Sequence, residues 1–196
     1  VPDAFTGGKP TKQALFGDPL VEEQRINQSV VPGAVDDNMY SKMLGDISSQ
    51  YGSSGEDIED LMGRISFHET GPTTRMDPTT VQKGGGPGRG LFQFETGAEQ
   101  GGATAMNRLK RYFKDNDMDV PDWAQVGEEG VDASQLTPSQ QKMMFLANTR
   151  YHPSASFRQG DIKDTSDWWS KYHWAGADKD KATRIASFES DMGYYQ

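Results

Sequence analysis

Apolar side chains recur with helical spacing in the segment that begins at residue 56. The apolar positions of this segment are Ile58, Leu61, Met62 and Ile65. Their spacing of three, four and seven residues places them on one face of a helix. Ser53 or Ser54 can cap its start, and the acidic residues of its first turns carry the charge that the helix dipole favours there. The pattern therefore predicts an amphipathic helix that ends at Gly71.

Similar patterns predict further helices along the chain. They lie within residues 38–51, 90–116 (after a strand or short turn), 136–152, 165–176 and 178–192. Thr137 and Pro138 are typical of a helix cap and a first helical position, and Thr165 or Ser166 can cap the next helix. Because strand signals are weak throughout, the fold class we expect is mainly α with at most a small β element.

The N-terminal segment, residues 1–37, differs from the rest of the chain. It contains proline, glycine and scattered charges without sustained periodicity. We therefore expect an extended or disordered arm over residues 1–37, with a few apolar residues that would suit docking to a partner. Residues 38–196 are predicted to form one helical domain.

The composition of the chain argues against several classes of function. The chain has no cysteine, and its three histidines lack a metal-binding spacing, so we expect no metal site and no cofactor. Its 22 glycines and 10 prolines favour a loop-rich protein, and no apolar run approaches the length that spans a bilayer. The net charge is −9, and the one basic segment, residues 107–114, is typical of a solvated helix face. We therefore predict neither nucleic-acid binding nor a membrane span.

The predicted helix that ends at Gly71 places a carboxylate in an unusual position. One more step of four along its apolar face reaches Glu69. Burial disfavours the anion of a carboxyl group, and the negative end of the helix dipole disfavours it further. A carboxyl group that keeps its proton can act as a general acid. The alternative is that Glu69 frays into solvent and pairs with Arg64 or Arg75.

Two later segments could supply a binding cleft for this acid. In residues 84–95, closely spaced glycines allow the backbone to approach a ligand, and Gln93 offers a donor and an acceptor. Residues 168–177 are rich in aromatic side chains, whose faces and polar edges suit sugar rings. The alternative is that Trp168 and Trp169 belong to the core and that Trp174 alone is exposed.

Three short motifs, in this order, resemble the lysozyme-like superfamily. They are His68-Glu69-Thr70-Gly71, Gly90-Leu91-Phe92-Gln93 and Lys171-Tyr172-His173-Trp174-Ala175-Gly176. They are most similar to the E-S, G-L-M-Q and A-Y-N-A-G motifs of Slt-type (goose-lysozyme-like) lytic transglycosylases, over residues 55–190. Thr70 replaces the family serine, His173 replaces the asparagine, and Trp174 is an extra residue. The H-E-T and G-R-G segments also resemble plant-type chitinases.

The resemblance implies a lysozyme-like fold and cleavage of peptidoglycan at the β-1,4 bond between N-acetylmuramic acid and N-acetylglucosamine. Glu69 would be the single catalytic group of a lytic transglycosylase, acting first as acid and then as base. The implied substrate-binding residues are Thr70, Gln93, Phe94, Tyr172, His173 and Trp174. A hydrolytic muramidase or a chitinase-like glycosidase would need a second carboxylate, for which Glu95 and Asp77 are the candidates.

The arm and the resemblance together suggest a setting for this activity. A peptidoglycan-cleaving domain with a docking arm, and with no signal segment at its start, is similar to a bacteriophage virion protein or endolysin. Its partners would be glycan strands and, through the arm, other virion proteins. Its location would be the virion or, during infection, the bacterial periplasm and cell wall. The competing interpretation is a structural virion protein with a vestigial lytic domain.

Overall fold

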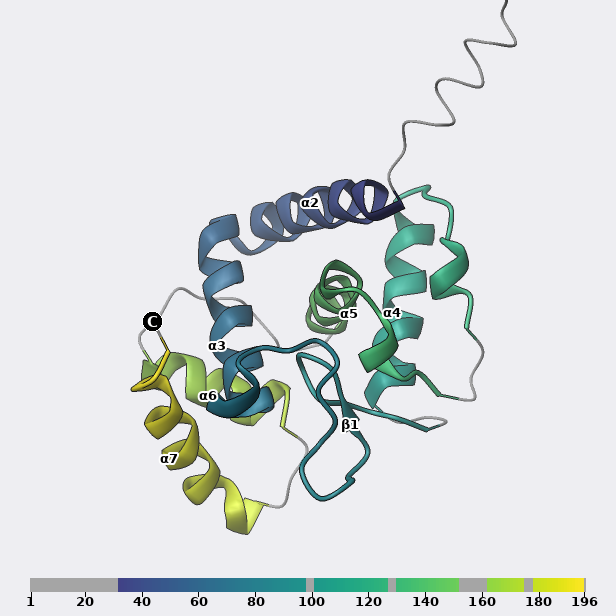
Figure 1. Cartoon of the computed structure of the whole chain (residues 1–196). Coiled ribbons are helices and arrows are strands. Elements are labelled where there is room, and N and C mark those ends of the chain that lie inside the picture. The colour runs from purple at the N-terminus through teal and green to yellow at the C-terminus, as the bar shows by residue number, and fades with distance from the viewer. Residues whose placement is uncertain (1–31, 98–100, 127–129, 152–161, 175–177, 196) are drawn as a thin grey trace, which may run out of the picture. The chain divides into compact units, whose positions relative to one another are not determined.

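The computed structural model describes residues 32–97, 101–126, 130–151, 162–174 and 178–195, and it is mainly helical (Figure 1). The α-helices are α2 (Pro32–Tyr51), α3 (Gly55–Thr74), α4 (Gly101–Asp115), α5 (Pro138–Arg150), α6 (Ile162–Tyr172) and α7 (Lys181–Met192). The described residues also form three 3₁₀ turns, η1 (Asp122–Ala124), η2 (Ala133–Gln135) and η3 (Asp178–Asp180). Two short strands are present as well, β1 (Gly88–Arg89) and β2 (Phe94–Glu95). The chain divides into the units Val1–Val35 and Asp36–Gln196, and the candidate site residues all belong to the second unit.

Helix α2 corrects the predicted boundary of the N-terminal arm. The helix begins at Pro32, so residues 32–37 are helical and not extended. Proline suits the start of a helix because its fixed φ is already helical and its missing N–H would have no partner in the first turn. The remainder of the predicted arm, residues 1–31, and any docking through it lie outside the described residues.

Helix α3 follows its sequence pattern closely. Ser54 caps it: its Oγ accepts a hydrogen bond from Asp57 N–H at 3.0 Å, and the Asp57 carboxylate accepts one from Ser54 N–H at 3.1 Å. The apolar stripe predicted from the sequence is buried. Gly71 interrupts the helix with φ 77° and ψ 162°, a conformation that only glycine adopts without strain. The predicted end of the regular helix at Gly71 is confirmed, and Glu69 lies in its last turn.

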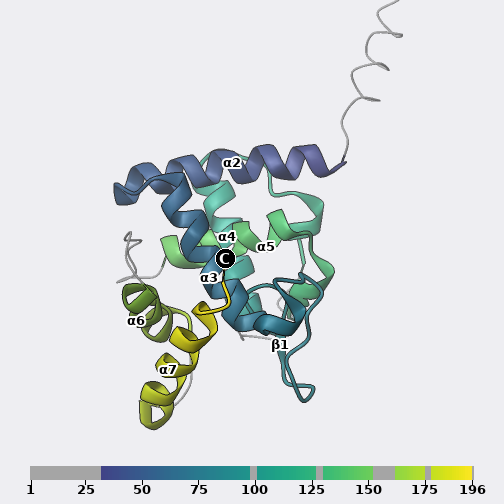
Figure 2. The same cartoon turned by 60° about the vertical axis from the view of Figure 1, so that its left-hand side comes forward.

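Helix α5 lies in the middle of the helical unit and packs against α4 (Figures 1 and 2). Its cap is the predicted one, because Thr137 Oγ1 accepts from Gln140 N–H and Gln140 Oε1 accepts from Thr137 N–H. Every residue from Met143 to Ala147 is buried, as expected for a helix that is enclosed on all sides.

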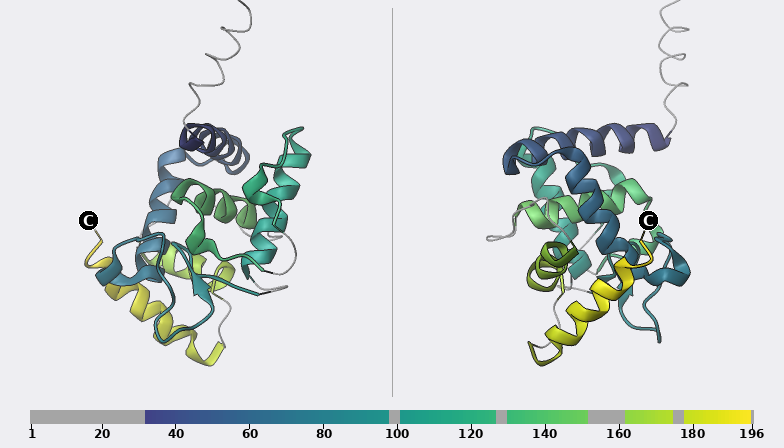
Figure 3. Two further views of the ribbon diagram at one scale, coloured as in Figure 1. Left: turned by 45° about the vertical axis from the view of Figure 1, so that its right-hand side comes forward. Right: turned by 90° about the vertical axis from the view of Figure 1, so that its left-hand side faces the viewer.

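Helices α6 and α7 pack against each other and against α3 (Figures 2 and 3). The predicted start of α6 is wrong: the helix begins at Ile162, and Thr165 and Ser166 are buried inside it. Ser166 Oγ donates to the carbonyl of Lys163 at 2.9 Å. A serine or threonine can thus satisfy its hydroxyl within a helix as well as at its cap.

The small β element forms a hairpin that is anchored to α5. Strands β1 and β2 pair antiparallel, with Gly88 opposite Glu95 and Arg89 opposite Phe94. The fully buried side chain of Gln141 accepts from Leu91 N–H at 2.7 Å and donates to the carbonyls of Pro78 and Leu136 at 3.0 and 2.9 Å. One buried amide on a rigid helix therefore fixes both the hairpin and the loop that precedes it.

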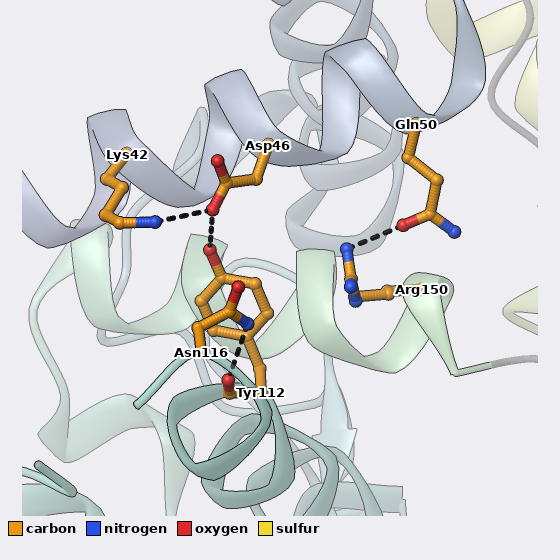
Figure 4. Close-up of polar contacts among 6 residues, drawn as sticks. All are labelled: Lys42, Asp46, Gln50, Tyr112, Asn116 and Arg150. Carbon is orange, nitrogen blue, oxygen red and sulfur yellow. Dashed lines mark hydrogen bonds and ion pairs between the residues drawn. The ribbon is translucent and has the colours of Figure 1, made fainter. Parts of the chain in front are cut away.

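Polar contacts tie α2 to α4 and α5 (Figure 4). The carboxylate of Asp46 accepts from Lys42 Nζ at 2.8 Å and from the hydroxyl of Tyr112 at 2.6 Å. These two hydrogen bonds, in that order, lower the pKa of Asp46, whereas burial and then the bond to Asp46 raise the pKa of Tyr112. Arg150 of α5 donates to Gln50 of α2 at 2.6 Å. Side chains thus join three helices that are distant in the sequence.

Candidate active site

Two hollows meet at the end of α3. The larger, of about 810 Å³, lies between the last turn of α3, residues 80–83, the end of α6 and helix α7. The smaller, of about 420 Å³, lies between the hairpin, the start of α4 and the end of α6. Both are lined by Glu69, Gln82, Gln93 and Trp174. The two hollows therefore form a cleft with Glu69 at its junction, and a chain-like ligand could extend to either side of this carboxyl group.

Glu69 is held by one strong contact. Its side chain is 17% exposed, and its Oε1 accepts a hydrogen bond of 2.6 Å from the indole Nε1–H of Trp169. An indole N–H can only donate, so Oε1 must be the acceptor. The alternative that Glu69 frays into solvent is wrong, because its side chain is largely enclosed and bonded.

His173 lies near the same carboxyl oxygen. Its Nε2 is 2.8 Å from the carbonyl oxygen of Phe92 and 3.6 Å from Glu69 Oε1. A carbonyl oxygen can only accept, so Nε2 must carry a hydrogen. The ring also lies edge-on to Phe92 and Phe94. His173 lines the smaller hollow, as expected from its motif, and its N–H adds positive potential beside Oε1.

Gln93, Phe94 and Trp174 also lie at the cleft, as predicted. Gln93 has a positive φ of 47° and donates its side-chain amide to the carbonyl of Gly90 at 2.7 Å. Its Oε1 has no hydrogen-bond partner among the residues that the structure describes, which leaves it to accept from a ligand. Phe94 is buried behind the smaller hollow, whereas Trp174 is half-buried and reaches both hollows.

Thr70 lines the larger hollow, but its hydroxyl is already engaged. Oγ1 donates to the carbonyl of Ser66 at 2.7 Å and accepts from Met76 N–H at 2.9 Å. The side chain therefore fixes the backbone on both sides of the kink at Gly71. In this way Thr70 helps to shape the wall of the cleft.

Of the residues that the third motif implied, Tyr172 lies outside both hollows. Tyr172 packs against Trp168, with 5.5 Å between ring centroids, and Lys171 Nζ lies 4.9 Å from its ring. Trp169, which the alternative placed in the core, is indeed buried, and it donates a hydrogen bond to Glu69. Ala175 and Gly176 of the same motif lie outside the described residues.

Of the two candidate second carboxylates, the structure places one at the cleft. Asp77 is exposed and accepts hydrogen bonds from the backbone and hydroxyl of Thr79 at 2.8 and 2.7 Å, which lower the pKa of Asp77. It does not line either hollow. Glu95 is exposed and lines the smaller hollow together with Glu69.

A histidine–aspartate pair lies beside the acid, and no sequence pattern pointed to it. His68 Nδ1 lies 2.7 Å from a carboxylate oxygen of Asp191 on α7, and both residues line the larger hollow. The His68 ring packs edge-on against Trp169, with 4.7 Å between ring centroids, and in a tilted arrangement against Phe188, with 4.8 Å between centroids. Asp191 therefore orients His68, which in turn supports the indole that holds Glu69.

The described part of the chain contains no cluster of three or more histidine, aspartate or glutamate side chains that could hold a metal ion. None of its described helices is both long and apolar enough to cross a membrane. No family model, curated protein or solved structure matches the chain. Its class is therefore defined by geometry: a mainly helical protein with an enclosed carboxyl group at the junction of a two-sided cleft.

Proposed function

We propose that this protein is a lysozyme-like enzyme that cleaves the β-1,4 bond between N-acetylmuramic acid and N-acetylglucosamine in peptidoglycan, as a lytic transglycosylase. The observation that carries the proposal is the position of Glu69 at the junction of two hollows, with one oxygen fixed by Trp169. A polymer bound along both hollows would present an internal glycosidic bond to this acid. The motif resemblance described above is consistent with this interpretation.

In the proposed reaction Glu69 acts twice. Its proton passes to the glycosidic oxygen while the bond from that oxygen to C1 of the muramyl sugar breaks, through an oxocarbenium-like transition state. The resulting carboxylate then takes the proton of the muramyl C6 hydroxyl as O6 bonds to C1. The products are a 1,6-anhydromuramyl end and a sugar with a free 4-hydroxyl, and the carboxyl group regains its proton.

Neighbouring hydrogen-bond donors stabilise Glu69 while it is an anion. The indole N–H of Trp169 is a donor in both states of Glu69, and its hydrogen bond strengthens when the carboxyl group becomes an anion. The N–H of His173 lies 3.6 Å from the same oxygen and adds to this stabilisation. Donors that are already in place need no reorganisation as charge develops.

A second candidate reaction is hydrolysis, as in a muramidase or a chitinase-like glycosidase. The observation that favours it is the carboxylate of Glu95 in the smaller hollow. In an inverting glycosidase the second carboxylate activates a water molecule from about 6.5–9.5 Å away. The two reactions differ in product, since hydrolysis leaves a reducing muramic acid and the transglycosylase leaves an anhydro end.

The biological setting is also a proposal: a bacteriophage virion-associated or lysis protein that acts in the periplasm or cell wall. A structural virion protein with a vestigial lytic domain is the alternative. Zymography separates them, because an active enzyme clears a cell-wall gel and a vestigial domain does not.

The decisive experiment compares the wild-type protein with Glu69→Gln on purified peptidoglycan. We expect the wild type to release anhydromuramyl products detectable by mass spectrometry. We expect the variant to lose at least about 1,000-fold in rate while its circular dichroism spectrum and melting temperature stay unchanged. Reducing-end products alone would replace the transglycosylase with a hydrolase, and wild-type-like lysis by Glu69→Gln would remove Glu69 from the site.

A further inference from the structure

Positive charge is distributed unevenly along the cleft. Lys83 and Arg184 line the larger hollow, whereas the described lining of the smaller hollow contains no lysine or arginine. The larger hollow also contains the carboxylate of Asp191, which accepts a hydrogen bond from His68, so two cations and this carboxylate line it. The smaller hollow instead contains the exposed carboxylate of Glu95. The two sides of Glu69 therefore differ in the charge that they present to a ligand.

The charges of Lys83 and Arg184 are available to a ligand. Both side chains are exposed, and neither has an ion-pair partner within the part of the chain that the structure describes. Some cations of this unit are instead neutralised locally, such as Lys42 by Asp46 at 2.8 Å and Lys142 by Glu59 at 2.7 Å. Two cations from segments about a hundred residues apart thus line one hollow, and neither forms an ion pair with a carboxylate of the described residues.

The positive charge of Lys83 and Arg184 is opposite in sign to the net charge of the chain. At −9 overall, the protein repels a polyanion at long range. An exposed charge acts mainly within a screening length of about 8–10 Å, so groups in the cleft wall determine what is bound there. An anionic ligand in the larger hollow would meet Lys83 and Arg184, and in the smaller hollow it would meet Glu95.

We propose that the larger hollow binds a carboxylate carried by the glycan strand, and that Lys83 and Arg184 select anionic over neutral β-1,4-glycans. This inference rests on the proposed glycan-cleaving function. The carboxylate has two possible sources, the lactyl group of a muramyl sugar that carries no peptide and the carboxyl groups of a stem peptide where one is attached. A neutral N-acetylglucosamine polymer has neither, so the same two residues separate a peptidoglycan-cleaving enzyme from a chitinase-like one.

The test measures equilibrium binding in a Glu69→Gln background, where substrates are not consumed. Three ligands are compared: soluble peptidoglycan fragments with stem peptides, the same glycans after the peptides are removed to free the lactyl carboxylate, and neutral N-acetylglucosamine oligomers. We expect Lys83→Gln and Arg184→Gln each to weaken binding of an anionic fragment about three- to fivefold, with no change for the neutral oligomer. Added salt should reduce the difference.

The control variant is Lys179→Gln, which removes an exposed cation in η3 that does not line either hollow. We expect it to leave all three affinities unchanged. Loss for the peptide-free glycans alone identifies the lactyl carboxylate, and loss for the peptide-bearing fragments alone identifies the stem peptide. Loss for both shows that the hollow accepts either carboxylate. Equal losses for charged and neutral ligands, or no loss for any, would overturn the inference.

These outcomes are distinct from failure of the proposed function. If the wild-type protein cleaves none of the three glycans, the proposed activity fails. The affinities for charged and neutral glycans then still show whether Lys83 and Arg184 select anionic ligands. If cleavage occurs but the substitutions at Lys83 and Arg184 leave selectivity unchanged, the activity stands and the inference fails.

Discussion

The indole Nε1–H of Trp169 donates a hydrogen bond of 2.6 Å to Oε1 of Glu69. The contact joins α6 to the last turn of α3, and it fixes the position of one oxygen of the carboxyl group. Trp169 is almost fully buried, so its ring has little freedom to move away from this position. The geometry of the proposed acid therefore depends on how two helices pack.

Removal of this donor should impair catalysis more than folding. In Trp169→Phe an aromatic ring remains but the N–H is lost. A hydrogen bond to a charged group contributes about 1.5–3 kcal/mol, so we expect kcat on peptidoglycan to fall about 10- to 100-fold. The smaller ring should lower the free energy of unfolding by about 1–2 kcal/mol. The matched control is Trp168→Phe, which should lose similar stability and keep its kcat. Equal kcat values for the two variants would contradict the role of Trp169.

Asp191 is expected to act as a positioning residue through His68. Asp191→Ala removes the acceptor for His68 Nδ1–H, so the His68 ring loses its orientation beside Trp169. We expect kcat to fall about three- to tenfold with little change in KM, and Asp191→Asn, which keeps an acceptor oxygen, to recover part of the loss. Nitrogen NMR of His68 should show loss of the single Nδ1–H tautomer in Asp191→Ala. An unchanged tautomer together with reduced kcat would exclude the proposed route.

The second carboxylate separates the two candidate reactions. If Glu69 works alone, Glu95→Gln should keep kcat within about threefold of wild type and yield the same anhydro products. If Glu95 activates water, the substitution should lower the rate at least about 100-fold. Asp77→Asn is the control, because Asp77 is exposed and does not line either hollow. Product analysis by mass spectrometry checks both outcomes.

The kink at Gly71 should be sensitive to any side chain. A Cβ added at this position would meet no atom within 4 Å, so the penalty of Gly71→Ala comes from its backbone angles alone. We expect a loss of about 1–3 kcal/mol in the free energy of unfolding. Gly45→Ala is the matched control: it lies inside α2, also has open space around it, and should stabilise the protein by about 0.4–1 kcal/mol. Urea unfolding measures both, and equal effects of the two substitutions would contradict the assigned kink.

The contact between α2 and α4 should be lost in acid. The pKa of Asp46 is lowered from 3.8 by its bonds to Lys42 and Tyr112. A lowered folded-state pKa means that the anion stabilises the fold above the unfolded pKa, and that this contribution disappears as pH falls through the folded value. Because Asp46 is partly exposed, Asp46→Asn should lower stability at pH 7 by about 1 kcal/mol or less. The gap in melting temperature between the two proteins should shrink as the pH falls through 3.8 and below it. A gap that is constant with pH would show that the carboxylate charge is not involved.

Much of the local structure could be predicted from the sequence. The buried stripe of α3, the caps at Ser54 and Thr137 and the interruption at Gly71 all depend on residues within a few positions of one another. The position of Glu69 on the core-facing side followed from the same spacing. The start of α6 was predicted wrongly because Thr165 and Ser166, which resemble cap residues, are buried within the helix instead.

The partners of Glu69 were decided by the tertiary structure. Trp169 is 100 residues from Glu69 in the sequence, and Asp191 is 123 residues from His68. Periodicity tells which face of a helix is buried, but not which face of another helix meets it. For this reason the sequence did not show that Trp169 contacts the acid, or that Glu95 rather than Asp77 lines the cleft. The sequence alone determined the candidate acid and the helix that carries it, because both depend on local spacing; the packing of α3, α6 and α7 decided its hydrogen bonds and the charges around it.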